Sequence, residues 1–186
     1  MAKFVPIKVS SPSLLPTRKH RTFIIFRAKK WQPYLFLRFY SSRADGAFLY
    51  TEPQSVIGFW WALDDCTLDN GCLWAVPGSH KIGVDRRYRR KDPPLKGTEF
   101  LPPKPVEFDL TSAVPLIIPK GTLVLLHSAL VHYSAENKSE TARHAYSVHI
   151  VDGKEGVKYP ADNWLQRPVD HPFQRCLWMK YLLLKF

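Results

Sequence analysis

The sequence predicts a mainly-β fold, an antiparallel sandwich or barrel with almost no helix in its core. Three observations indicate this fold class: short apolar runs rich in β-branched and aromatic residues, turn dipeptides between those runs, and the lack of a helical hydrophobic period. The chain has 186 residues, 45% of them hydrophobic and 13% aromatic. It is therefore long enough for one globular domain with a sizeable core.

Turn signals separate the expected strands. Asn70-Gly71 is a strong hairpin signal between two apolar runs, and Pro77-Gly78 marks a second turn. A proline-rich segment, roughly 91–105, is expected to be a loop. The expected strands, in chain order, are VIGFWWALDD (56–65), CLWAVP (72–77), PLIIP (115–119), GTLVLL (121–126) and ARHAYSVHIV (142–151).

The net charge of +11 is concentrated at one end of the chain. Residues 1–44 hold ten Lys and Arg and no Asp or Glu, which leaves seventeen basic and sixteen acidic residues for 45–186. The folded part is therefore nearly neutral, and we expect no nucleic-acid binding by it. The run RRYRRK (86–91) could steer the phosphates of a coenzyme A thioester, although a solvated charged loop is the commoner role of such a run.

Composition divides the chain into a basic leader (1–42), a core (43–168) and an apolar tail (169–186). Three cysteines, none in a C-x-x-C spacing, favour the cytoplasm or another reducing compartment. No apolar run reaches the roughly 18 residues of a membrane span, and a monomer is expected. The leader resembles a mitochondrial transit peptide, but prolines at positions 6, 12 and 16 interrupt the helix of such peptides, so targeting is the weaker interpretation.

The candidate chemistry begins at Asp45, the first acid of the chain. In a strand, residues two apart share a face, so a His-x-Asp pair presents an imidazole and a carboxylate to one point. A distant second His completes the two-His, one-carboxylate face that holds Fe(II). His132 follows an apolar strand, and Arg143, eleven residues later, could bring a guanidinium into the same cavity and bind a carboxylate there.

Several blocks of the sequence resemble one known family. They are D-x-A-F-L-Y-T-E-P from Asp45, IGFWWALDDCTLDNGCLWAVPGSHK, KGTLVLLHSALVH, and R-x-A-Y-S-x-H from Arg143. Together these blocks resemble the phytanoyl-CoA dioxygenase family over about Asp45 to Pro168. The resemblance implies a double-stranded β-helix, or jelly roll, that binds Fe(II) and 2-oxoglutarate, with ascorbate as a compatible reductant. The implied substrate is a small molecule, such as an acyl-CoA or another organic acid derivative.

The resemblance also implies roles for individual residues. Asp45 and His132 would be metal ligands, and Arg143 would bind the far carboxylate of 2-oxoglutarate. Ser134 would support that carboxylate, and Trp60 would wall the pocket, a role compatible with a place in the core.

The chain departs from the family pattern at Arg43. Arg43 stands where the family has the first His, and a guanidinium has no lone pair for a metal. We expect Arg43 to pair with Asp45, and metal affinity to drop. The family also has a longer segment before this motif, and the leader 1–42 shows no resemblance to it, so we expect an alternative or misassigned start and a jelly roll that lacks N-terminal strands. His127 and His149 are expected to be structural, since His149 lies six residues, about 20 Å of strand, beyond Arg143.

Three hypotheses follow from this pattern. The first is an Fe(II)/2-oxoglutarate dioxygenase in a truncated form whose own turnover is doubtful. The second is a non-catalytic jelly-roll module that binds an anion or small molecule through Arg143 and Ser134. The third is a chain that does not fold stably, because missing strands would expose sheet edges.

Overall fold

The computed structural model describes residues 23–24, 44–104 and 107–173, and every structural statement below concerns these ranges. Strands dominate them, and the only helices described are two short 3-10 turns, so the mainly-β prediction is confirmed. In chain order the elements are β1 (Phe23–Ile24), η1 (Asp45–Ala47), β2 (Ile57–Ala62), β3 (Leu73–Ala75), η2 (Ser79–Ile82), β4 (Arg87–Arg90), β5 (Thr98–Leu101), β6 (Val114–Pro115), β7 (Leu123–His127), β8 (His132–Ser134) and β9 (Ala145–Ile150).

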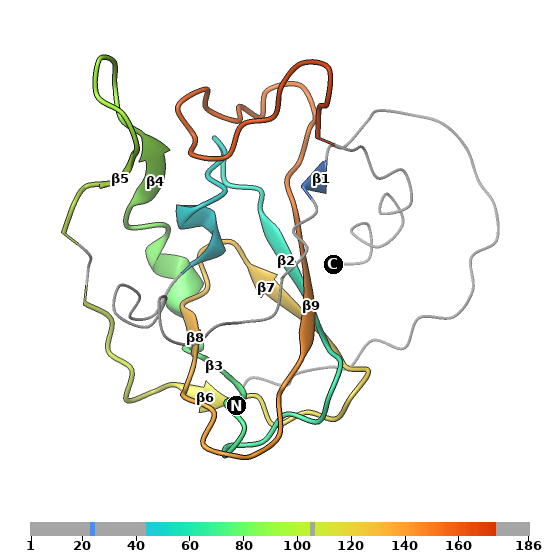
Figure 1. Cartoon of the computed structure of the whole chain (residues 1–186). Coiled ribbons are helices and arrows are strands. Elements are labelled where there is room, and N and C mark those ends of the chain that lie inside the picture. Colours follow the sequence, from blue (N-terminus) through green and yellow to red (C-terminus); the bar gives the residue numbers. More distant parts are fainter. Residues whose placement is uncertain (1–22, 25–43, 105–106, 174–186) are drawn as a thin grey trace.

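The strands form three antiparallel sheets (Figure 1). The largest has the order β1-β9-β2-β7, the second has the order β6-β3-β8, and β4 pairs with β5 in a separate hairpin. In the largest sheet, β2 lies between β9 and β7, with Gly58 opposite both His149 and Leu126. This register fixes which side chains meet on the inner face of the sheet.

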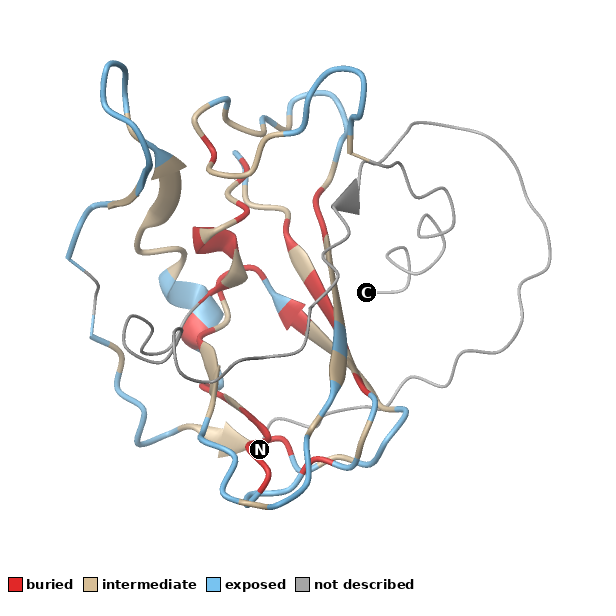
Figure 2. Cartoon of the chain, viewed as in Figure 1, coloured by how far each residue is buried: buried red, intermediate tan, exposed pale blue. Residues whose placement is uncertain are grey.

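Alternation along β2 sends its side chains into two of the three core clusters. Trp60 and Ala62 point to one side, where they pack with Leu73 of β3 and Leu126 of β7, so this cluster joins the two larger sheets. Phe59 points to the other side and packs with Ile150, Trp61 and other apolar residues. Both sides of β2 are therefore buried (Figure 2), and each buried large apolar side chain contributes roughly 1.5–3 kcal/mol.

The hairpin predicted at Asn70-Gly71 is wrong, although the turn is present. The strands on either side of it, β2 and β3, belong to different sheets. The Asn70 side chain holds the turn, donating to the Asp65 carbonyl and accepting from the Thr67 N–H, and Gly71 takes a positive φ of 78°. Asn70 and Gly71 do form a turn, but this turn carries the chain from one sheet to the other.

The loop predicted for 91–105 is also partly wrong, because it contains β5. This strand pairs with β4, which lies within the arginine run 86–91. Arg87 makes a bidentate pair with Asp162 at 2.9 and 3.0 Å, and Arg89 bridges Asp92 and Glu99. Carboxylates of the hairpin itself and one from a distant segment, Asp162, therefore neutralise much of the charge that made a strand improbable from sequence.

Two further strand predictions need adjustment. The expected strand 115–119 is reduced to β6 and an isolated bridge between Cys66 and Ile118. The short strand β8 was not predicted, because its sequence, HYS, has no apolar run. It lies in the second sheet against β3.

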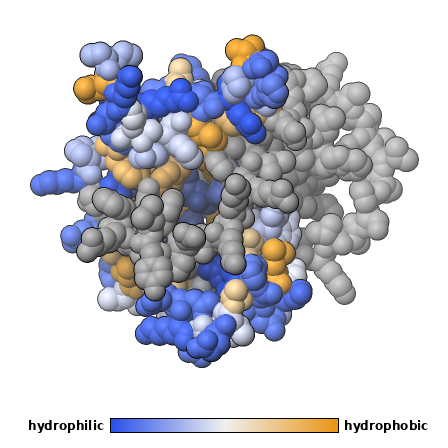
Figure 3. Space-filling model, in the orientation of Figure 1, coloured by the Kyte–Doolittle hydropathy of each residue, from blue (hydrophilic) through white to orange (hydrophobic). Residues whose placement is uncertain are grey.

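The surface of the described part is mostly hydrophilic on the face that Figure 3 presents, with apolar side chains in small separate patches. Among the residues that the structure describes, no helix has the length and apolar character needed to cross a membrane. Of the predicted basic leader only 23–24 is described, and residues 174–186 of the predicted tail lie outside the described residues.

Candidate metal centre and anion pocket

Asp45 begins the 3-10 turn η1, so the prediction that it lies in a strand is wrong. Its carbonyl accepts the backbone N–H groups of Phe48 and Leu49, which closes the turn, and the N–H of Gly46 donates to Ser128 O at 2.8 Å. These bonds anchor η1 to the segment between β7 and β8. They hold the partly buried carboxylate of Asp45, 17% exposed, over the largest sheet.

Gly58 of β2 makes room for this carboxylate. A Cβ atom placed on Gly58 would lie 2.7 Å from Asp45 Oδ2 and 3.3 Å from the Cβ of Leu126. Contacts below 3.0 Å are essentially never seen for real Cβ atoms. The inner face of β2 is therefore recessed at this one position, and Asp45 fills the recess.

His132, the first residue of β8, faces the same carboxylate. Its Nδ1 lies 2.9 Å from Leu130 O, and its Nε2 lies 3.7 Å from Asp45 Oδ1. Because a carbonyl only accepts, Nδ1 carries the hydrogen, and in the neutral ring Nε2 keeps its lone pair. Two electron-pair donors thus face each other at a separation too long for a hydrogen bond.

His149 of β9 lies on the other side of Asp45. Its Nε2 is 3.1 Å from Asp45 Oδ2, and its side chain is 18% exposed. The expectation that His149 is too far from the site is therefore wrong. The distance was counted along the backbone from Arg143, but Asp45 arrives from another segment, over the Gly58–His149 pair.

The charge on Asp45 alters the titration of His149. Burial acts to lower the pKa of His149, but the charge of Asp45 and its hydrogen bond outweigh burial, so the net pKa is raised. The imidazole is thereby favoured in its protonated form.

Arg143, Ser134 and Trp60 form a second cluster, a candidate anion-binding site (the anion pocket). The Arg143 guanidinium donates to Ser134 Oγ at 3.0 Å and to the Gly71 carbonyl at 2.9 and 3.2 Å. It also lies over the Trp60 ring, 5.3 Å from the centroid. Burial lowers the pKa of Arg143, but a guanidinium remains charged in proteins. Among the described residues no carboxylate pairs with it.

Two strands connect the anion pocket to the Asp45 site. In β8, His132 faces Asp45 and Ser134 binds Arg143; in β2, Gly58 lies under Asp45 and Trp60 lies under Arg143. Residues two apart in a strand share a face and are separated by about 7 Å. Both strands therefore place the two clusters one such step apart on the same inner surface.

The donor set fits a cation in part. Asp45 Oδ1 and His132 Nε2 are 3.7 Å apart, within reach of one ion, since metal bonds to such atoms are about 2.0–2.2 Å long. Within the described ranges, no group of three His, Cys, Asp or Glu side chains has the arrangement of a metal site. Arg43, which stands at the position of the family's first His, lies outside the described residues.

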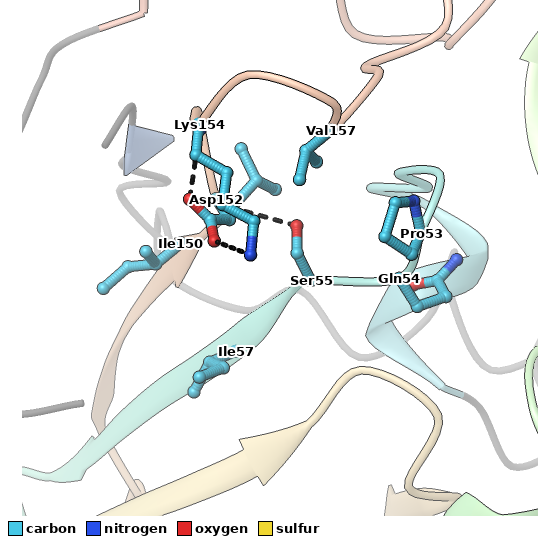
Figure 4. A pocket seen from close by; sticks show the side chains of 9 residues that line it. Pro53, Gln54, Ser55, Ile57, Ile150, Asp152, Lys154 and Val157 are labelled. Carbon is cyan, nitrogen blue, oxygen red and sulfur yellow. Dashed lines mark hydrogen bonds and ion pairs between the residues drawn. The ribbon is translucent and has the colours of Figure 1, made fainter. Parts of the chain in front are cut away.

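The remaining candidates lie elsewhere. His127 packs against His80 with the ring centroids 5.3 Å apart and the rings tilted by 58°, and its Nδ1 accepts the Ala129 N–H. A cavity of about 250 Å³ opens beside Ile57 and Ile150 (Figure 4). These two neighbours of Gly58 and His149 point to the opposite face of the sheet, so the cavity is separate from the Asp45 site.

Comparison with known proteins places the chain in a family. The model of the phytanoyl-CoA dioxygenase (PhyH) family matches residues 16–145. The match begins inside the 1–42 segment, upstream of Asp45, and ends before Pro168. The chain is 48% identical to phytanoyl-CoA dioxygenase 1 of Oryza sativa subsp. japonica over 125 residues, covering 67% of this chain and 43% of that protein.

Animal proteins show a similar level of identity. Phytanoyl-CoA dioxygenase domain-containing protein 1 of Bos taurus is 44% identical over 131 residues, covering 69% of this chain and 44% of that protein. The chain therefore spans less than half the length of the curated relatives it matches.

Solved structures give more distant similarity. EvdO2 from Micromonospora carbonacea var. aurantiaca, complexed with 2-oxoglutarate, is 23% identical with a TM-score of 0.47, covering 68% of this chain and 51% of that chain. The non-heme monooxygenase ThoJ is 21% identical with a TM-score of 0.48, covering 72% and 51% of the two chains. The family match and the relatives above 40% identity carry the assignment: this chain belongs to the phytanoyl-CoA dioxygenase family.

Proposed function

We propose that the two clusters form the centre of an Fe(II)- and 2-oxoglutarate-dependent oxygenase. Asp45 and His132 would hold the metal, and Arg143 with Ser134 would bind the far carboxylate of 2-oxoglutarate, with Trp60 as the pocket wall. The observation that carries the proposal is the placement of His132 and Ser134 on one face of β8, the first facing Asp45 and the second bonded to Arg143.

The protein's own contribution is binding and orientation. The Leu130 carbonyl holds His132 in the tautomer that leaves Nε2 as a ligand. Gly71 and Ser134 fix the guanidinium of Arg143 before any anion arrives, which reduces the entropy lost on binding. Iron, when bound, would supply the redox chemistry that couples decarboxylation of 2-oxoglutarate to oxidation of a C–H bond in a small organic substrate.

Arg43 limits this proposal for the chain's own activity. A guanidinium cannot replace the imidazole ligand, so we expect weak metal binding and little turnover unless that residue is changed. The cluster of Arg143 and Ser134 does not depend on the metal. A non-catalytic module that binds small dicarboxylates is therefore the second candidate function.

The arginines of β4 do not favour a coenzyme A phosphate site. Arg87 and Arg89 are engaged by carboxylates at 2.9–3.1 Å, and Arg86 lies over the ring of Phe100 at 4.0 Å. We therefore propose a small organic acid derivative as the substrate class. An acyl-CoA is the alternative substrate to be compared with it in an activity assay.

The test is an anaerobic titration of Fe(II) and then 2-oxoglutarate into the full chain and into Arg43→His, followed by the visible charge-transfer absorption. We expect a strong band in Arg43→His, a weak or absent band in the unaltered chain, and none in Arg43→His with Asp45→Ala. Absence of the band from a cooperatively folded Arg43→His variant would refute the metal site.

The anion pocket has its own test. Arg143→Lys keeps the charge but cannot hold Gly71 and a carboxylate together in the same way. The affinity for 2-oxoglutarate, measured by calorimetry, should fall about 10- to 100-fold, as expected for charged hydrogen bonds of about 1.5–3 kcal/mol. An unchanged affinity would contradict the assignment of Arg143.

A further inference from the structure

Asp45 is flanked by two imidazoles on opposite oxygens. His132 approaches Oδ1 at 3.7 Å and His149 approaches Oδ2 at 3.1 Å. The residues come from β8 and β9, which belong to different sheets, so the carboxylate lies between the two sheets. The two contacts have different chemistry.

The hydrogen on each ring follows from the neighbouring atoms. His132 donates through Nδ1 to Leu130 O, so in the neutral ring Nε2 is an electron-pair donor toward Asp45. His149 places Nε2 at 3.1 Å from a carboxylate oxygen, and because a carboxylate only accepts, a hydrogen bond here requires the hydrogen on Nε2. One ring is thus arranged as a ligand, and the other as a hydrogen donor to the ligand beside it.

We propose that His149 is a positioning residue that holds Oδ2 of Asp45 through Nε2–H, so that Oδ1 is directed toward His132. The inference rests on the proposed function, because it assigns Oδ1 as the metal-binding oxygen. Under this proposal His149 does not replace the missing third ligand, because its Nε2–H is directed at Asp45 and so offers no lone pair to a metal.

The surroundings support a fixed carboxylate. Gly58 is the residue directly opposite His149 in the register of β2 and β9, and a Cβ on Gly58 would lie 2.7 Å from Asp45 Oδ2 and 3.5 Å from His149 Cδ2. Oδ2 is therefore confined by the backbone of Gly58 on one side and by the His149 ring on another. Removal of a residue that orients a metal ligand typically lowers the metal affinity 10- to 100-fold.

The first experiment needs no metal. Nitrogen-15 NMR of the imidazoles in the full chain should show His149 with a hydrogen on Nε2 and His132 with its hydrogen on Nδ1. In Asp45→Ala the His149 signals should shift while those of His127 stay unchanged. A His149 ring with an unprotonated Nε2 in the unaltered chain would overturn the proposal.

The second experiment measures Co(II) affinity in the full chain and in the Arg43→His background. We expect His149→Leu to weaken binding 10- to 100-fold, and His149→Gln, whose amide can still donate to Oδ2, to recover most of the loss. His127→Leu, a change of the same size on β7 away from Asp45, is the matched control and should leave the affinity unchanged.

The outcomes separate the two proposals. If Asp45→Ala abolishes Co(II) binding and His149→Leu has no effect, the positioning role is wrong and the metal site stands. If Asp45→Ala has no effect either, the proposed metal site fails, and the metal-orienting role of His149 fails with it. Loss of binding in both His149→Leu and His149→Gln, with Co(II) spectra showing one nitrogen ligand fewer, would instead make His149 a direct ligand and overturn the inference.

Discussion

Gly58→Ala would displace the Asp45 carboxylate without removing any atom of the proposed metal site. The new Cβ would lie 2.7 Å from Oδ2, where ordinary contacts begin at 3.4 Å, so one of the two groups must move by about 0.7 Å. The backbone of β2 is held on both sides by β7 and β9, so the carboxylate moves. Functional groups generally need placement within about 0.5 Å, and this shift exceeds that tolerance.

We expect metal affinity in Gly58→Ala to fall 10- to 100-fold while stability changes little. Replacing a strand glycine with alanine favours folding by about 0.5–1 kcal/mol, which offsets part of the cost of the new contact. For a chain of this length, 1 kcal/mol corresponds to about 2–4 °C in Tm. Calorimetric titration of Co(II) in the Arg43→His background, together with a thermal melt, measures both quantities.

Ile57→Val is the matched control, because Ile57 precedes Gly58 on β2 and points to the opposite face of the sheet. It removes one methyl group, should cost about 0.5–1.5 kcal/mol of stability, and should leave Co(II) affinity unchanged. The reasoning is refuted if Gly58→Ala binds Co(II) as tightly as its parent, or if its affinity falls only in proportion to a loss of folded protein.

Two further predictions concern titrating groups. Burial raises the thiol pKa of both Cys66 and Cys72. In a Cys176→Ser background we therefore expect neither thiol to react with a thiol reagent at pH 7.5 in the native protein, and both to react after denaturant is added. Rapid reaction of the native protein would contradict this. The Asp64 carboxylate accepts the backbone N–H and the ring of His144, which lowers its pKa below the ordinary 3.8. Its stabilisation is therefore present above that value and lost as the pH falls through the folded pKa. The Tm gap between the chain and Asp64→Ala should narrow as the pH falls below 3.8; a gap that stays unchanged or widens as the pH falls below that value would contradict this.

Strong local patterns made the central sheet predictable. The apolar runs of β2, β7 and β9 contain β-branched and aromatic residues that suit a buried strand, and all three were expected near their observed bounds. The arginines of β4 concealed a strand, because one partner carboxylate, Asp162, lies more than seventy residues away from Arg87 in sequence. Asn70-Gly71 identified a turn but gave no information on which sheet follows it.

Part of the candidate site could also be predicted from the sequence, and part could not. Resemblance between motifs singled out Asp45, His132 and Arg143, and the structure brings each into one of two adjoining clusters. His149 was missed because backbone distance from Arg143 was used in place of spatial neighbours. The available signal was the pairing of β2 with β9, which sets His149 opposite a glycine, the one residue that leaves space for a side chain from another segment.

The short strand β8 makes both halves of the site depend on a single alignment. Its pairing with β3 sets Trp74 opposite Tyr133, and their rings stack 6.1 Å apart at an angle of 11°. A slip of one residue would rotate His132 and Ser134 away from the inner surface and bring Tyr133 toward it. The proposed metal site and the proposed dicarboxylate site would then be lost together, so an insertion or deletion within these three residues would be far more damaging than one in the turn after them.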